Sequence, residues 1–113
     1  MITILHNPRC GKSREGLGLL ENSGKDFEVL KYLDEPISEE ILKNIISLLG
    51  IKPLELVRKN EAIWKSDFKT KTLSDAEIIK LMIAHPKLIE RPIVINGKKA
   101  VIGRPPQDIL NII

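Results

Sequence analysis

The sequence predicts an α/β fold: a mixed four-stranded sheet with a helical insertion between a β-α-β half and a β-β-α half. Three observations lead to this prediction. Short β-branched runs lie near both ends of the chain, apolar residues at helical spacing fill the middle, and Asn96-Gly97 separates two apolar runs. Residues 1–113 are therefore expected to form a single domain, with the insertion at about residues 37–86.

The β-α-β half begins with a buried strand. Residues 2–5 are apolar and β-branched, and Pro8 ends the strand because proline has no N–H to donate. A helix follows, with leucines on one side and charged residues on the other, and it stops at residues 22–24. Residues 26–32 are the predicted second strand. A strand, a helix and a strand of this length form a parallel crossover.

Two glycines interrupt the predicted first helix. Gly16 and Gly18 lie inside it, and a helical glycine costs about 1 kcal/mol relative to alanine. A helix that keeps such residues is expected to need either close packing or local mobility at these positions.

The insertion is predicted to be helical. Ser38 caps its first long helix, and Ser74 begins a second one with a capping-box pattern. Residues 59–72, which lie between these helices, are polar. Two aromatic residues are expected to anchor this stretch, namely Trp64 and Phe68.

The β-β-α half completes the predicted sheet. Residues 93–95 form a strand, Asn96-Gly97 turns the chain, and residues 98–102 form the partner strand. A last helix then carries Ile109, Leu110 and Ile113. This order of elements matches a thioredoxin-like fold.

Composition restricts the classes of function. The single cysteine allows no intramolecular disulfide, and charged residues such as Arg9 and Arg14 interrupt any signal peptide, so a soluble cytoplasmic protein without a membrane partner is expected. The net charge is only +3 and aromatic residues are 4% of the chain, which does not favour a nucleic-acid partner. One cysteine and two distant histidines predict no metal site, and no bound cofactor is expected.

Cys10 is the candidate reactive group. It lies between a strand and the start of a helix, where backbone N–H groups and the positive end of the helix dipole collect. His6, Arg9, Lys12 and Arg14 are within four residues of it, and positive charge favours a thiolate. We therefore expect a reactive cysteine beside an anion pocket. The alternative is that Cys10 is a small buried apolar residue.

Four segments together resemble the glutaredoxin-linked arsenate reductases. The first contains Ile-Leu-His-Asn-Pro-Arg-Cys-Gly-Lys-Ser-Arg, and the others occur in the same order and at the family's spacing. The resemblance covers essentially the whole chain, through residues 2–14, 56–60, 85–94 and 102–105.

The resemblance implies a reaction and a set of site residues. Cys10 would attack arsenate to form a covalent thiolate–arsenate adduct, and three arginines would surround the oxyanion: Arg58, Arg91 and Arg104. Glutathione would be the co-substrate and glutaredoxin the protein partner that resolves the mixed disulfide. An enzyme that borrows its resolving thiols needs only one of its own.

The same resemblance assigns supporting roles. Ser13 would donate a hydrogen bond to the thiolate, His6 would help to set its charge, and Pro92 would be a cis-proline facing the loop. The sequence departs from the family at Arg9, where a small residue is usual, and Lys12 adds a second charge.

Two other functions fit parts of the sequence. A glutathione-dependent thiol/disulfide reductase on the same fold would need Cys10 but would depend less on the three arginines. A non-enzymatic regulator that binds RNA polymerase shares the fold and typically carries a Cys-x-x-Cys switch. The chain has Ser13 at the second position of that motif, and serine cannot form the disulfide.

Overall fold

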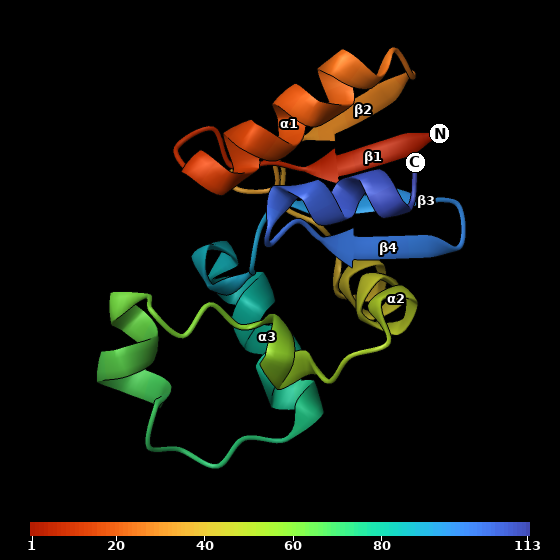
Figure 1. Cartoon of the computed structure of the whole chain (residues 1–113). Coiled ribbons are helices and arrows are strands. Elements are labelled where there is room, and N and C mark those ends of the chain that lie inside the picture. The colour runs from red at the N-terminus through yellow and green to blue at the C-terminus, as the bar shows by residue number, and fades with distance from the viewer. The chain divides into compact units, whose positions relative to one another are not determined.

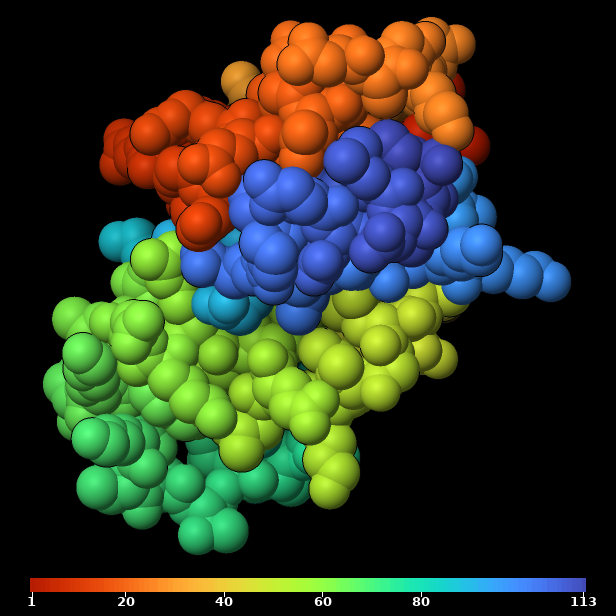
Figure 2. Space-filling model, viewed as in Figure 1, coloured from red at the N-terminus to blue at the C-terminus, as the bar shows by residue number.

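The computed structural model describes all 113 residues and divides into two compact units (Figure 1). The first unit, here the sheet unit, combines Met1–Glu35 with Arg91–Ile113, and the second, the insertion unit, is Pro36–Glu90. Segments from both ends of the chain, red and dark blue, lie side by side in the sheet unit (Figure 2). None of the helices is both long and apolar enough to cross a membrane.

The sheet unit contains the predicted mixed four-stranded sheet. Its strand order is β2-β1-β3-β4, with β1 parallel to β2 and antiparallel to β3. The β3–β4 hairpin is also present, and Gly97 takes φ +61° in its turn. The strands are β1 (Ile2–Leu5), β2 (Phe27–Leu30), β3 (Ile93–Asn96) and β4 (Lys99–Ile102).

The second strand is shorter than the predicted range of 26–32. It pairs only with β1, so it forms an edge of the sheet. Val29 is 40% exposed there, although the alternation of side chains along the strand predicts that Phe27 and Val29 both point inward. An edge strand has a neighbour on one side only, which leaves part of an inward side chain uncovered.

One face of the sheet is covered by α1 (Gly11–Ser23) and by the short 3₁₀ helix η4 (Pro106–Asn111). Figure 1 shows these two helices next to each other, although they come from opposite ends of the chain. Their packing against the strands forms an apolar core of Ile2, Ile4, Leu20, Val94 and Ile109. This core fixes the start of α1 relative to the strands.

The two helical glycines differ. A Cβ added at Gly16 would lie 2.9 Å from Pro92 Cγ and 2.9 Å from Ile109 Cδ1, whereas one added at Gly18 would meet no atom within 4 Å. Gly103 also approaches Pro92, with its added Cβ at 2.8 Å from Pro92 Cγ. Close packing therefore explains Gly16, and it holds Pro92 between α1 and the end of β4.

The insertion unit is helical, as predicted. Ser38 Oγ accepts a hydrogen bond from Ile41 N–H at 3.1 Å, and Ser74 forms a capping box with Glu77. Trp64 is buried and its ring centroid lies 6.4 Å from that of Phe68. The elements are α2 (Glu39–Leu49), η1 (Pro53–Leu56), the π-helical turn η2 (Trp64–Phe68), α3 (Asp75–Ala84) and η3 (Pro86–Leu88).

Candidate active site

Cys10 is the N-cap residue of α1. Its backbone is extended, with φ −97° and ψ 124°, and its carbonyl accepts the first helical hydrogen bond from Arg14 N–H at 3.0 Å. The loop before it turns on Asn7, whose carbonyl accepts from Cys10 N–H and whose side-chain oxygen accepts from Arg9 N–H, both at 3.0 Å. The half-buried thiol is thereby placed at the free N–H groups of the helix.

Groups around the sulfur lower the pKa of the Cys10 thiol. Burial by itself raises this pKa, but hydrogen bonds from the backbone N–H groups of Ser13 and Lys12 and from the Arg91 side chain outweigh burial. Arg104 adds a further cation, with its Nη2 at 3.9 Å from Sγ. The site therefore favours a thiolate, which is the nucleophilic form of cysteine.

Arg91 and Arg104 are linked to each other. Arg104 Nε donates a hydrogen bond to the Arg91 carbonyl at 3.0 Å, while Nη2 of the same guanidinium faces the sulfur. Arg91 is only 6% exposed, and the peptide bond between it and Pro92 is cis, as is the one between Arg104 and Pro105. Two arginines that are 13 residues apart in sequence thus meet at Cys10.

His6 and Ser13 form a buried pair behind the loop. His6 Nδ1 lies 2.7 Å from Ser13 Oγ, which also accepts from Asn7 N–H at 2.9 Å. Burial lowers the pKa of His6, and the charges of Lys31 and Arg14 lower it further, against an opposing effect of its hydrogen bond with Ser13. His6 is therefore neutral near pH 7. It acts on the site through Ser13 and supplies no positive charge to the thiolate.

The cations next to Cys10 in sequence have a different role from the one expected. Arg14 Nη1 donates to the Pro8 carbonyl at 3.0 Å and so fastens the loop to the first turn of the helix. Arg9 and Lys12 have exposed side chains. The lowered thiol pKa comes instead from backbone N–H groups and from Arg91, which is distant in sequence.

Arg58 belongs to the insertion unit. Its backbone N–H donates to the Leu88 carbonyl at 2.6 Å, and its Nε lies 3.7 Å from Glu61 Oε1. Its Nη1 is buried and has no hydrogen-bond partner. Its place at the oxyanion site stays a prediction.

The roles of Asn7 and of the contact between Arg14 and Pro8 were not predicted from the sequence. Asn7 is 6% exposed and organises the whole turn that precedes Cys10. Asn-Pro after a strand is a recognised turn signal, so the dipeptide Asn7-Pro8 could have predicted that Asn7 forms this turn. The Arg14 contact could not be found in this way, because a surface arginine carries no local sequence signal for its partner.

Comparison with known proteins identifies the family. The ArsC family model matches residues 5–112, a range that includes Cys10, Arg91 and Arg104. The chain belongs to the ArsC family. Among its ArsC relatives, a Haemophilus influenzae protein named arsenate reductase is 45% identical over 99% of this chain and 98% of its own length.

Two further ArsC relatives match from end to end. The Escherichia coli K12 protein named uncharacterized protein YfgD is 42% identical over 99% of this chain and 96% of its own. The solved structure of an arsenate reductase from Vibrio cholerae has a TM-score of 0.94 and 43% identity, covering 99% of this chain and 97% of that one. The predicted thioredoxin-like fold is thereby confirmed as that of the ArsC arsenate reductases.

Proposed function

We propose that this ArsC-family protein is an enzyme that reduces arsenate to arsenite, with Cys10 as the nucleophile and with glutathione and glutaredoxin as the source of electrons. One observation carries the proposal: the Cys10 sulfur is surrounded by backbone N–H groups and by the guanidinium groups of Arg91 and Arg104. The relatives named arsenate reductase support the choice of substrate.

The first step joins two negatively charged reactants. Arsenate is an anion, so a thiolate repels it unless positive charge lies between them or around them. Arg104 presents a donor 3.9 Å from Sγ, and a guanidinium group can hold two oxygens of a tetrahedral oxyanion. In the proposal Arg91 and Arg58 supply further donors. Sγ attacks arsenic and an S–As bond forms, while the As–O bond to a hydroxyl group of protonated arsenate breaks and this hydroxyl takes one further proton and leaves as water.

The second step transfers two electrons. The thiolate of glutathione attacks the Cys10 sulfur, and the S–As bond breaks with its electron pair remaining on arsenic. Arsenic(V) becomes arsenic(III), arsenite leaves, and Cys10 is left in a mixed disulfide with glutathione. A glutaredoxin thiol then attacks that disulfide and restores the Cys10 thiolate. The chain has only one cysteine, which fits a cycle in which the resolving thiols come from partners.

A coupled assay tests the proposal. NADPH oxidation is followed with glutathione, glutaredoxin and glutathione reductase, with and without arsenate. We expect oxidation that depends on arsenate and disappears in Cys10→Ser, whereas the double variant Lys98→Gln/Lys99→Gln, at two exposed positions of the β3–β4 hairpin, retains it. Oxidation with a small organic disulfide but not with arsenate would contradict the proposal and identify a thiol/disulfide reductase instead.

A further inference from the structure

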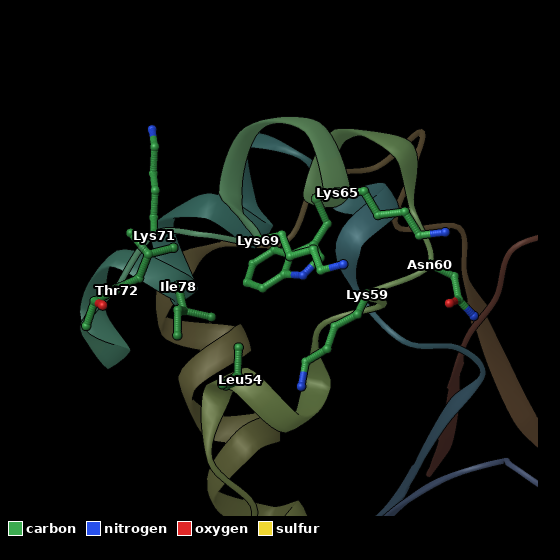
Figure 3. A pocket seen from close by; sticks show the side chains of 10 residues that line it. Leu54, Lys59, Asn60, Lys65, Lys69, Lys71, Thr72 and Ile78 are labelled. Atoms are coloured by element: carbon green, nitrogen blue, oxygen red, sulfur yellow. The ribbon is translucent and has the colours of Figure 1, made fainter.

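The insertion unit contains a cavity of about 630 Å³ (Figure 3). Its lining residues come from η1, from the first half of α3, from Leu73 just before that helix and from the polar stretch 59–72, which includes η2. Small-molecule sites in proteins have volumes of about 300–1,000 Å³. The cavity is therefore large enough for an organic ligand.

One part of the cavity wall is apolar. Leu54, Trp64, Leu73 and Ile78 contribute to it, and Trp64 and Ile78 are 7% and 3% exposed. The indole of Trp64 is held by its contact with the Phe68 ring. Trp64 and Ile78 are buried and hold this part of the wall in place, whereas Leu54 is 39% exposed. An apolar ligand that covers the exposed part removes it from water.

The rest of the wall is polar, and its only charges are positive. Four lysines line the cavity, and no aspartate or glutamate does: Lys59, Lys65, Lys69 and Lys71. None of them takes part in an ion pair within 4.0 Å, unlike Lys43, which pairs with Glu39, and Arg58, which pairs with Glu61. Positive groups around a concave apolar surface concentrate anions there.

Two acidic residues of the stretch 59–72 have partners other than the cavity lysines. Glu61 lies beside Arg58, and Asp67 accepts a hydrogen bond from the Ser66 hydroxyl at 2.8 Å. Figure 3 shows Lys59 extending toward Leu54, while Lys71 extends away from it, and Lys71 Nζ lies 5.4 Å from the Phe68 ring centroid. Lys59 is thus directed toward the apolar wall, and a ligand can contact both.

We propose that this cavity binds small organic anions that carry an apolar body. An inorganic anion would leave the apolar wall in water, and a neutral apolar molecule would leave four lysines without counter-charge. Lysine offers a point charge on a flexible stem and does not select a planar headgroup. A carboxylate, sulfonate or phosphate headgroup is therefore accepted, and the apolar body determines the fit. This inference does not rest on the chemistry of Cys10.

Trp64 makes the proposal directly measurable, because it is the only tryptophan in the chain. The full-length protein is titrated with 8-anilino-1-naphthalenesulfonate, an anion with an apolar body, while Trp64 emission is recorded. We expect saturable quenching of Trp64 with energy transfer to the bound dye. The double variant Lys59→Gln/Lys69→Gln should weaken dye binding about tenfold, because it removes two of the positive charges that attract the sulfonate.

A matched variant controls for the loss of charge. Lys98→Gln/Lys99→Gln also removes two exposed lysines, but these lie in the β3–β4 hairpin of the sheet unit, in its turn and at the start of β4, and should leave dye affinity unchanged. Far-UV circular dichroism and thermal unfolding verify that each variant is folded, because the dye also binds partly unfolded chains. The neutral compound N-phenyl-1-naphthylamine should bind more weakly and equally to all three proteins.

Three results would overturn the proposal. The first is no quenching of Trp64 by the sulfonate at concentrations up to about 1 mM, which corresponds to negligible affinity. The second is equal affinity of the wild type and of Lys59→Gln/Lys69→Gln for the sulfonate. The third is an equal loss of affinity in both double variants, which would indicate an effect of net charge without a site.

Discussion

The two units of the protein use positive charge in different ways. In the sheet unit, Arg91 is almost fully buried, and Arg104 is held by a hydrogen bond to the Arg91 carbonyl while it faces the Cys10 sulfur. In the insertion unit, four exposed lysines line a cavity and form no ion pair. In the sheet unit, guanidinium groups and backbone N–H groups at fixed positions stabilise charge on the Cys10 sulfur. In the insertion unit, the flexible lysine side chains place positive charge around a whole cavity.

The difference follows from what each kind of site must do. A nucleophile needs a lowered pKa and donors placed at defined positions, which requires side chains locked by packing and by hydrogen bonds. Attraction of an anion requires positive charge nearby but does not require donors at defined positions. The comparison therefore predicts that the reactivity of Cys10 in the sheet unit depends on the shape of the side chains around it, even in variants that keep the net charge.

The largest expected effect is the loss of the nucleophile. Cys10→Ser should reduce arsenate-dependent NADPH oxidation by at least about a thousandfold, because a serine hydroxyl remains protonated where a thiol ionises. Steady-state rates at saturating arsenate measure this loss. Thermal unfolding should show that the variant is folded. Substantial residual activity in Cys10→Ser would mean that the reaction does not pass through a covalent adduct at this residue.

Arg104 tests whether geometry matters more than charge. Arg104→Ala should lower kcat/KM for arsenate about a hundredfold, which is the usual cost of removing one donor from a transition-state anion. Arg104→Lys should recover little of this, because one ammonium cannot both donate to the Arg91 carbonyl and face the sulfur as the guanidinium does. If Arg104→Lys were fully active, the arginine would act as a mobile charge, like the lysines of the insertion unit.

The two glycines of α1 test the packing behind the site. Gly16→Ala should lower the free energy of unfolding by about 1–3 kcal/mol, because its Cβ would overlap with Pro92 and Ile109. Gly18→Ala should raise it by up to about 1 kcal/mol, since that position is open and alanine favours a helix. Denaturant unfolding measures both. Equal effects at the two positions would contradict the close packing of Pro92.

The smallest expected effect is a shift in the titration of the thiol. The rate of Cys10 alkylation by iodoacetamide should rise with pH and level off once the thiolate dominates, with a midpoint below the value of about 8.5 for a free cysteine. Arg104→Gln removes a cation beside the thiolate, so the midpoint should move to higher pH. A midpoint unchanged in Arg104→Gln would show that its guanidinium does not stabilise the charged form.

The sequence was sufficient for most of the architecture. The short β-branched runs at 2–5 and 93–95, the capping serines Ser38 and Ser74 and the Asn96-Gly97 turn all act over a few residues, and each is found where it was predicted. The edge position of β2 was not predicted, because it depends on which strands become neighbours. Local signals specify elements, whereas their exposure is a property of the assembled sheet.

By itself, the sequence determined that Cys10 would lie at the start of a helix, because a strand, a proline and a helical pattern surround it. Only the tertiary structure decided which charges reach the sulfur. The neighbours expected to ionise it do not do so: His6 is neutral and Arg14 is bonded to Pro8, whereas Arg91 and Arg104 arrive from the far end of the chain. Electrostatic interactions depend on distance in space and on burial, and neither follows from how far apart two residues are in the sequence.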